Sequence, residues 1–104
     1  MNTVFKALSD PTRRRVLQLL RAGPKSAGEL AAGFAVSKPT MSAHFAVLRE
    51  ADLIEASRNG KSIIYRLKMS VLEEALMELA QAVGLDLSAG AEAAASRDAH
   101  RRES

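Results

Sequence analysis

The side chains best suited to chemistry in this chain are small polar and basic residues clustered at 37–44 and 58–61. Serine and threonine hydroxyls can hydrogen-bond base edges or phosphates, and an alanine methyl can contact the methyl of thymine. On a helix, such small residues would enter a DNA major groove about 12 Å wide without steric obstruction. The candidates for DNA contact in the first cluster are Ser37, Lys38, Thr40, Ser42, Ala43 and His44.

A helix over residues 37–51 would present these side chains on one face. Met41, Phe45 and Leu48 recur at i, i+4 and i+7, which predicts a buried apolar stripe on the opposite face. Ser37 is placed to cap this helix, and its free N-terminal amides could bind phosphate. An ordinary amphipathic helix with a solvated polar face is the alternative interpretation.

The second cluster lies at the predicted turn of a β-hairpin. Polar and apolar residues alternate over 54–58 and 61–67, and Asn59-Gly60 between them favours a type I′ turn. That turn would pair Ala56 with Ile63 and would leave basic side chains at the tip. The tip candidates for DNA contact are Arg58, Asn59 and Lys61, although a single basic hairpin can also be a plain surface turn.

The remaining elements are predicted from capping and breaking residues. A short helix around 4–8 ends at Ser9, and Asp10-Pro11 starts a second helix that stops at Gly23. Ser26 and Glu29 form a capping box for a third helix, and a fifth opens at Ser70 and ends at Gly84. The predicted fold is mainly α with a β-hairpin wing (α+β): a winged helix-turn-helix of five helices over residues 1–83. Residues 84–104 are predicted to be a flexible or frayed helical tail.

Two apolar stripes could serve either the chain's own core or a dimer interface. The fifth helix carries apolar residues at i, i+4, i+7 and i+11, and the first helix is more apolar than a short exposed helix should be. A homodimer would use both helices. The candidates for dimerisation are Val4, Phe5, Leu8, Leu72, Leu76, Leu79 and Val83.

Other chemistries have few residues to build on. The chain has no cysteine and only two histidines, His44 and His100, so we expect neither a metal site nor a cofactor. No triad spacing, glycine-rich phosphate loop or carboxylate pair indicates an enzyme. His44 is interpreted as a phosphate or base contact, with a partly buried structural side chain as the alternative. In the arginine run at 13–15, Arg14 is taken as a phosphate contact, and a solvated charged face is the alternative.

The charge composition agrees with a nucleic-acid partner. The 104 residues carry a net charge of +3, and residues 1–83 hold 12 Lys/Arg against 8 Asp/Glu. The positive charge therefore belongs to the predicted folded part. No apolar run is long enough to span a membrane, and no signal pattern opens the chain, so we expect a cytoplasmic protein.

Three segments in order resemble the ArsR-type family of bacterial winged-helix repressors: FKALSDPTRR (5–14), SKPTMSAHFAVLR (37–49) and GKSIIY (60–65). The resemblance is closest to the metal-independent branch, which includes autorepressors. It implies a homodimer that binds duplex DNA at an inverted-repeat operator. It also implies base contacts from Lys38, Thr40, Ser42 and His44, with wing contacts near Arg58 and Lys61.

The chain departs from the metal-sensing members of that family. Cysteine ligands are missing from residues 26–31, and the paired acidic and histidine ligands are missing from residues 72–78. We therefore do not carry over the family's metal response. Ala43 stands where a bulkier polar residue is common. The expected function is a transcriptional repressor, and the alternative is a winged-helix module that binds proteins. No residue pattern defines an inducer, whether a protein or a small molecule.

Overall fold

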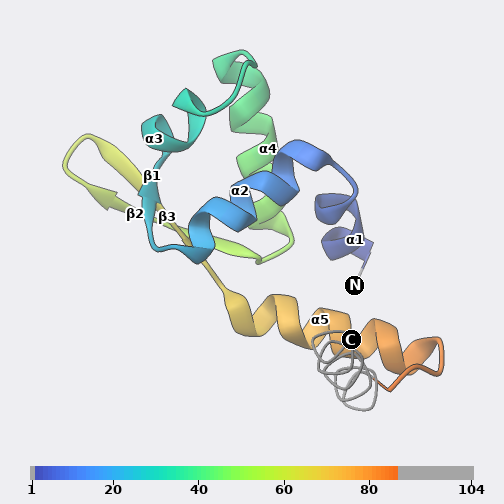
Figure 1. Cartoon of the computed structure of the whole chain (residues 1–104). Coiled ribbons are helices and arrows are strands. Elements are labelled where there is room, and N and C mark those ends of the chain that lie inside the picture. Colours follow the sequence, from blue (N-terminus) through green and yellow to red (C-terminus); the bar gives the residue numbers. More distant parts are fainter. Residues whose placement is uncertain (1, 87–104) are drawn as a thin grey trace, which may run out of the picture. The chain divides into compact units, whose positions relative to one another are not determined.

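The computed structural model describes residues 2–86 and contains the five expected helices and the hairpin (Figure 1). The chain divides into two units at Leu72, inside the last helix. The predicted tail lies outside the described residues from position 87 onward. In chain order the elements are α1 (Asn2–Leu8), α2 (Pro11–Arg21), β1 (Lys25–Ser26), α3 (Ala27–Ala32), α4 (Lys38–Glu50), β2 (Ile54–Asn59), β3 (Ser62–Leu67) and α5 (Met69–Ala82).

The predicted helix starts are confirmed by their capping bonds. The carboxylate of Asp10 accepts the backbone N–H of Arg13 at 3.1 Å. Ser26 and Glu29 exchange two 3.0 Å bonds between side chain and backbone, which completes the capping box. The Ser37 hydroxyl accepts the backbone N–H of Thr40 at 3.3 Å. Each bond satisfies a donor that a helix start otherwise leaves unpaired.

The ends of α4 and α5 share one backbone motif. Gly84 has φ +79°, and the N–H of Leu85 bonds the carbonyl of Ala80 at 2.7 Å, so α5 ends as Gly84 predicted. At the end of α4 the left-handed residue is Asp52, with φ 60°, and the N–H of Leu53 reaches the carbonyl of Leu48 at 3.1 Å. This sharp stop turns the chain into β2.

The hairpin forms, but its turn and register differ from the prediction. Asn59 pairs with Ser62 and Ala56 pairs with Tyr65, which is a shift of two residues. The turn residues are therefore Gly60 and Lys61, and of these two only Gly60 has positive φ, at +65°. Positive φ at the first central position alone is typical of a type II′ turn, so the predicted type I′ turn is wrong.

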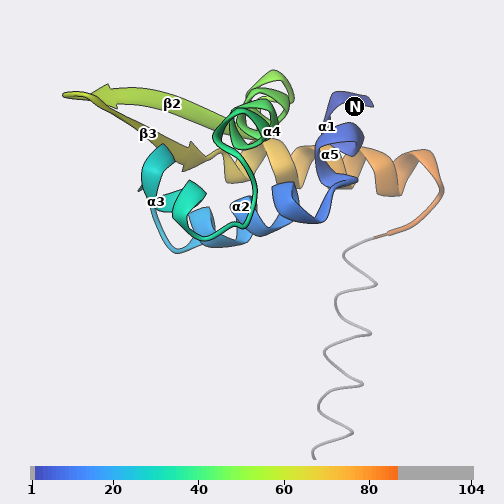
Figure 2. The same cartoon turned by 90° about the horizontal axis from the view of Figure 1, so that it is seen from above.

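A short third strand completes the sheet in the order β1-β3-β2. Lys25 pairs with Tyr65 and Ser26 with Ile64, so the segment before α3 is tied to the hairpin. Two residues carry too little pattern to predict a strand. The hairpin projects beyond the helices of the first unit (Figure 2). Its base is anchored in the core of that unit, which contains Val16, Leu17, Leu20, Leu30, Met41, Phe45, Leu48, Leu53, Ile54 and Tyr65.

Candidate nucleic-acid interface

The outward face of α4 carries most of the predicted DNA-contacting residues. Met41, Phe45 and Leu48 are buried, as the periodicity predicted, so this helix is held by its opposite face. Small and polar side chains remain on the surface without a bulky apolar group among them. The exposed residues of the predicted set are Ser37, Lys38, Thr40, Ser42 and Ala43.

The first turn of α4 has an ordered pair of hydroxyl groups. The Ser37 hydroxyl donates to Oγ1 of Thr40 at 2.9 Å while it accepts the Thr40 backbone N–H. Because Thr40 is the acceptor in this pair, its own hydroxyl hydrogen can still be donated to another group. A surface donor held at a helix N-terminus is suited to a phosphate oxygen or to an acceptor on a base edge.

The wing presents its basic residues at and next to the turn. Arg58 and Asn59 end β2, Lys61 lies in the turn itself, and all three are exposed. The corrected register moves Lys61 from a strand position to the tip of the hairpin. Two cationic side chains on a projecting hairpin could reach the phosphate backbone of a duplex bound at α4.

The arginine run of α2 is directed toward neighbouring protein groups. Arg14 is exposed, and its Nη1 donates to the carbonyl of Leu8 at 2.8 Å. The guanidinium of Arg15 donates to the side chain of Gln18 at 3.0 Å. A guanidinium has five N–H donors, so one such bond leaves Arg14 able to contact a phosphate as well.

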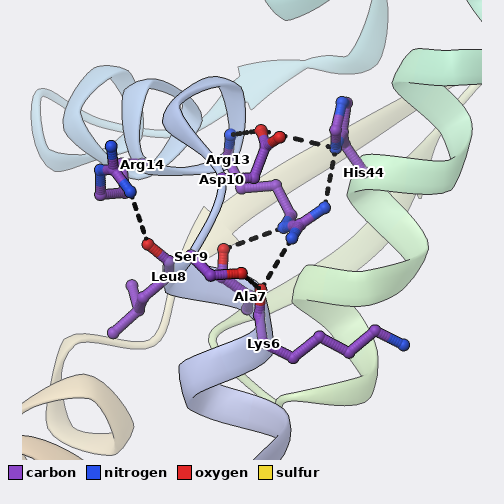
Figure 3. Close-up of polar contacts among 8 residues, drawn as sticks. All are labelled: Lys6, Ala7, Leu8, Ser9, Asp10, Arg13, Arg14 and His44. Atoms are coloured by element: carbon purple, nitrogen blue, oxygen red, sulfur yellow. Dashed lines mark hydrogen bonds and ion pairs between the residues drawn. The ribbon is translucent and has the colours of Figure 1, made fainter.

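Arg13 is the most extensively bonded residue of this run (Figure 3). Its Nε donates to the carbonyl of Ala7 at 2.9 Å, and its Nη2 donates to the carbonyl of Lys6 at 2.7 Å. These carbonyls end α1 and have no partner inside that short helix, so Arg13 caps it. The third nitrogen, Nη1, lies 3.1 Å from Nδ1 of His44 in α4.

His44 is turned toward α2, and 15% of its side chain is exposed. Besides Arg13, its Nδ1 lies 3.9 Å from a carboxylate oxygen of Asp10 (Figure 3). These are the contacts of a partly buried side chain, and the phosphate or base contact of His44 stays a prediction. Sequence reasoning named His44, Asp10 and Arg13 separately and did not bring them together, because they are far apart in the chain.

The pKa of Asp10 is lowered, in agreement with the hydrogen bond and charges around its carboxylate. The hydrogen bond from the Arg13 backbone is the main reason that the pKa of Asp10 lies below its ordinary value. The positive charge of the Arg13 guanidinium acts in the same direction, and desolvation opposes it. The carboxylate is therefore the charged form at neutral pH, and it serves as both helix cap and counter-charge.

The predicted dimerisation residues differ in exposure. Val4 is 5% exposed and belongs to the core, and Phe5 is half-buried. Leu8 and Leu72 line an open groove whose other lining residues are Leu17, Leu67, Arg14, Gln18 and Arg21. Along α5, Leu79 is half-buried, Leu76 is 41% exposed and Val83 is 62% exposed. Met77 and Leu85 are also exposed apolar residues, and the periodic stripe did not include them.

Neither a metal-binding cluster of side chains nor a membrane-spanning helix occurs within residues 2–86. No group of three or more histidine or acidic side chains in this part of the chain lies close enough to bind a metal ion. In the same residues, none of the helices is both long and apolar enough to cross a membrane.

The known proteins most relevant to this chain are helix-turn-helix transcriptional regulators. A family described as a helix-turn-helix domain matches residues 8–56. The transcriptional repressor SdpR of Bacillus subtilis is 46% identical over 76 residues, which cover 73% of this chain and 84% of SdpR. The HTH-type transcriptional regulator CmtR of Mycobacterium tuberculosis is 40% identical over 97 residues, covering 90% of this chain and 82% of CmtR.

A solved structure agrees with these relatives. The crystal structure of the ArsR family transcriptional regulator RHA00566 superposes with a TM-score of 0.73 at 30% identity. The match covers 80% of this chain and 91% of that protein. The similarity therefore extends beyond residues 8–56, which the helix-turn-helix family matches.

Proposed function

The chain belongs to the ArsR family of winged helix-turn-helix transcriptional repressors, and from that premise we propose that it binds a specific duplex operator as a homodimer. The main support is the outward face of α4, where small polar residues are exposed opposite a buried apolar stripe. A helix of this kind can enter the major groove and bring its polar side chains to base edges.

The residues of α4 divide between positioning and reading DNA. Ser37 and Lys38, at the helix start, are placed to contact phosphates through their backbone N–H groups and the Lys38 ammonium group. Thr40 and Ser42 offer hydroxyl donors to base edges, and Ala43 offers a methyl that suits thymine. Repression then follows from occupancy of the operator, and the gene's own promoter is one candidate, as in autorepressors.

The wing and α2 supply contacts that are independent of sequence. We assign Arg58, Asn59 and Lys61 to the DNA backbone beside the recognition helix, because they are exposed on the projecting hairpin. Arg14 uses one donor on Leu8 and can direct others to a phosphate. These contacts contribute affinity that falls as salt concentration rises.

The dimer is supported by apolar surface that a monomer would leave in water. Leu76 and Val83 in α5 are exposed, and Leu8 and Leu72 line an open, mainly apolar groove. A second copy would cover such surface symmetrically, and two copies would match an inverted-repeat operator. Residues from α1 and α5 therefore both contribute to the proposed interface.

Two further properties complete the proposal. We propose that repression does not depend on a metal ion, since a chain without cysteine cannot supply thiolate ligands. Operator binding should then be the same with a chelator as with added Zn²⁺. We also place the protein in the cytoplasm, where a bacterial regulator meets DNA.

The decisive experiment is a gel shift on the DNA upstream of its own gene, with a scrambled duplex as competitor and a salt series. Selective binding of two protomers, weakened steeply by salt, is expected. Lys61→Gln should lower the salt slope by about one, as expected when one phosphate contact is lost. Thr40→Val, which keeps the shape without the hydroxyl, should reduce discrimination against the scrambled duplex.

Lys68→Gln is the matched control, because it removes the same charge from a side chain paired with Asp52 at 2.8 Å. If the scrambled duplex competes equally, a selection from random duplexes should be made next. Failure of that selection as well would contradict the repressor and favour a module that binds a protein partner.

A further inference from the structure

The side chains of Asp10, Arg13 and His44 connect three elements of the first unit at one point (Figure 3). Arg13 uses Nε and Nη2 to cap α1, and it directs Nη1 to His44 in α4. Asp10 starts α2 through its bond to the Arg13 backbone. One guanidinium of α2 therefore contacts groups of both α1 and α4.

The contact between Arg13 and His44 requires one form of the imidazole ring. A guanidinium has only donors, so Nδ1 of His44 can form this hydrogen bond only as an acceptor, in the neutral tautomer with its ring hydrogen on Nε2. The carboxylate of Asp10 is 3.9 Å from the same Nδ1, too far for a hydrogen bond, and acts there as a nearby negative charge.

His44 lies one helical turn after Thr40, so a displacement of α4 at His44 also displaces Thr40. The charged groups facing the ring are Asp10 and Arg13, while the ammonium group of Lys6 points away from it (Figure 3). Only 15% of the His44 side chain is exposed, which favours a role inside the protein over a contact with DNA.

We propose that Asp10, Arg13 and His44 form a positioning cluster that sets the orientation of the recognition helix and controls operator affinity without touching DNA. This inference rests on the proposed function. It separates His44 from the residues of α4 that read bases, and it gives Arg13 a role different from that of Arg14. A displacement of the C-terminal end of α1 would be transmitted to α4 through the same guanidinium.

The test compares full-length variants on a duplex that the wild-type protein selects from a random library. His44→Leu removes the acceptor and should weaken selective binding about tenfold, as expected for loss of a hydrogen bond to a charged group. His44→Asn places an amide oxygen near the position of Nδ1 and should restore binding to within about threefold of wild type. The salt slope should be unchanged in both, because no phosphate contact is lost.

Arg13 is tested in parallel with a charge-matched control. Arg13→Gln should weaken binding about tenfold, whereas Arg15→Gln removes the same charge from a side chain bonded to Gln18 and should have a smaller effect. If Arg13→Gln does not fold, Arg13→Lys keeps the charge but cannot bond three acceptors in the same way, and it should also weaken binding. Nitrogen-15 NMR should show His44 with its ring hydrogen on Nε2.

The possible outcomes have separate meanings. If His44→Leu binds the duplex with wild-type affinity, the proposed positioning role is wrong. It is also wrong if the salt slope of Arg13→Gln is lower than that of Arg15→Gln by about one, because Arg13 would then contact a phosphate. Either result would leave the proposed repressor function intact. A ring hydrogen on Nδ1 would also overturn it. Failure of the wild-type protein to select any duplex would instead overturn the proposed function, and this inference with it.

Discussion

The ring of Phe45 in the recognition helix packs against the ring of Tyr65 in strand β3, with centroids 4.7 Å apart and planes inclined by 33°. Both side chains are buried. This pair connects the helix proposed to read bases with the hairpin proposed to contact the backbone. Aromatic pairs of this geometry stabilise packing beyond the area that they bury. The two elements proposed to contact DNA are therefore held together in one core.

Removing the Phe45 ring should destabilise the whole first unit. Phe45→Ala leaves a cavity between α4 and β3, and we expect the free energy of unfolding to fall by about 3–5 kcal/mol. Urea denaturation followed by circular dichroism measures this. Ile63→Ala, at an exposed position on the same sheet, should change it by about 0.5 kcal/mol or less. Equal losses in the two variants would contradict the packing.

Tyr65 should titrate at higher pH than a free tyrosine. Burial raises the pKa of its phenol above the ordinary value of 10.0, although the charge of Arg49 opposes the shift. Because the chain contains one tyrosine and no tryptophan, the ultraviolet absorbance of tyrosinate reports this group alone. The protein unfolded in urea should return to the ordinary value.

The same shift predicts how stability depends on alkaline pH. The folded state favours the neutral phenol, so this contribution is fully present below the unfolded pKa and is lost as pH rises through the folded one. Tyr65→Phe keeps the aromatic pair and should remove this part of the alkaline loss. An identical decline in the variant would show that other groups cause it.

The turn of the wing should depend on Gly60 and not on Asn59. Gly60 has φ +65°, and a Cβ there would meet nothing within 4 Å, so Gly60→Ala costs backbone strain alone, about 1 kcal/mol. Asn59 needs no positive φ, and Asn59→Ala should cost about 0.5 kcal/mol or less. Thermal unfolding distinguishes them, since a type I′ turn at Asn59-Gly60 would make both substitutions costly.

The proposed dimer should be sensitive to a charge on the exposed side of α5. Leu76 is 41% exposed, so Leu76→Glu should leave helix content unchanged while raising the dimer dissociation constant at least about tenfold. Sedimentation velocity over a protein dilution series measures it. Gln81→Glu adds the same charge at another exposed position of α5 and should have little effect. Unaltered dimers in Leu76→Glu would place the interface elsewhere.

Local sequence was sufficient to predict the five helices and the residues that cap them. Asp10, Ser26 and Ser37 cap helices by bonding a backbone N–H three residues ahead, so short segments contain the whole signal. The same holds for Gly84 and for the buried stripe of α4. Because that stripe fixes which face of α4 is buried, it also predicted that the small residues on the opposite face are exposed.

Tertiary structure decided the hairpin register and the contacts of His44. A shift of two residues keeps every side chain on its face, so alternation of polar and apolar residues does not distinguish Ala56 opposite Ile63 from Ala56 opposite Tyr65. His44 lies 31 residues from Arg13, and no local pattern specifies that separation. Packing of α1, α2 and α4 brings the two side chains together, because only the folded chain places distant polar groups within hydrogen-bonding distance.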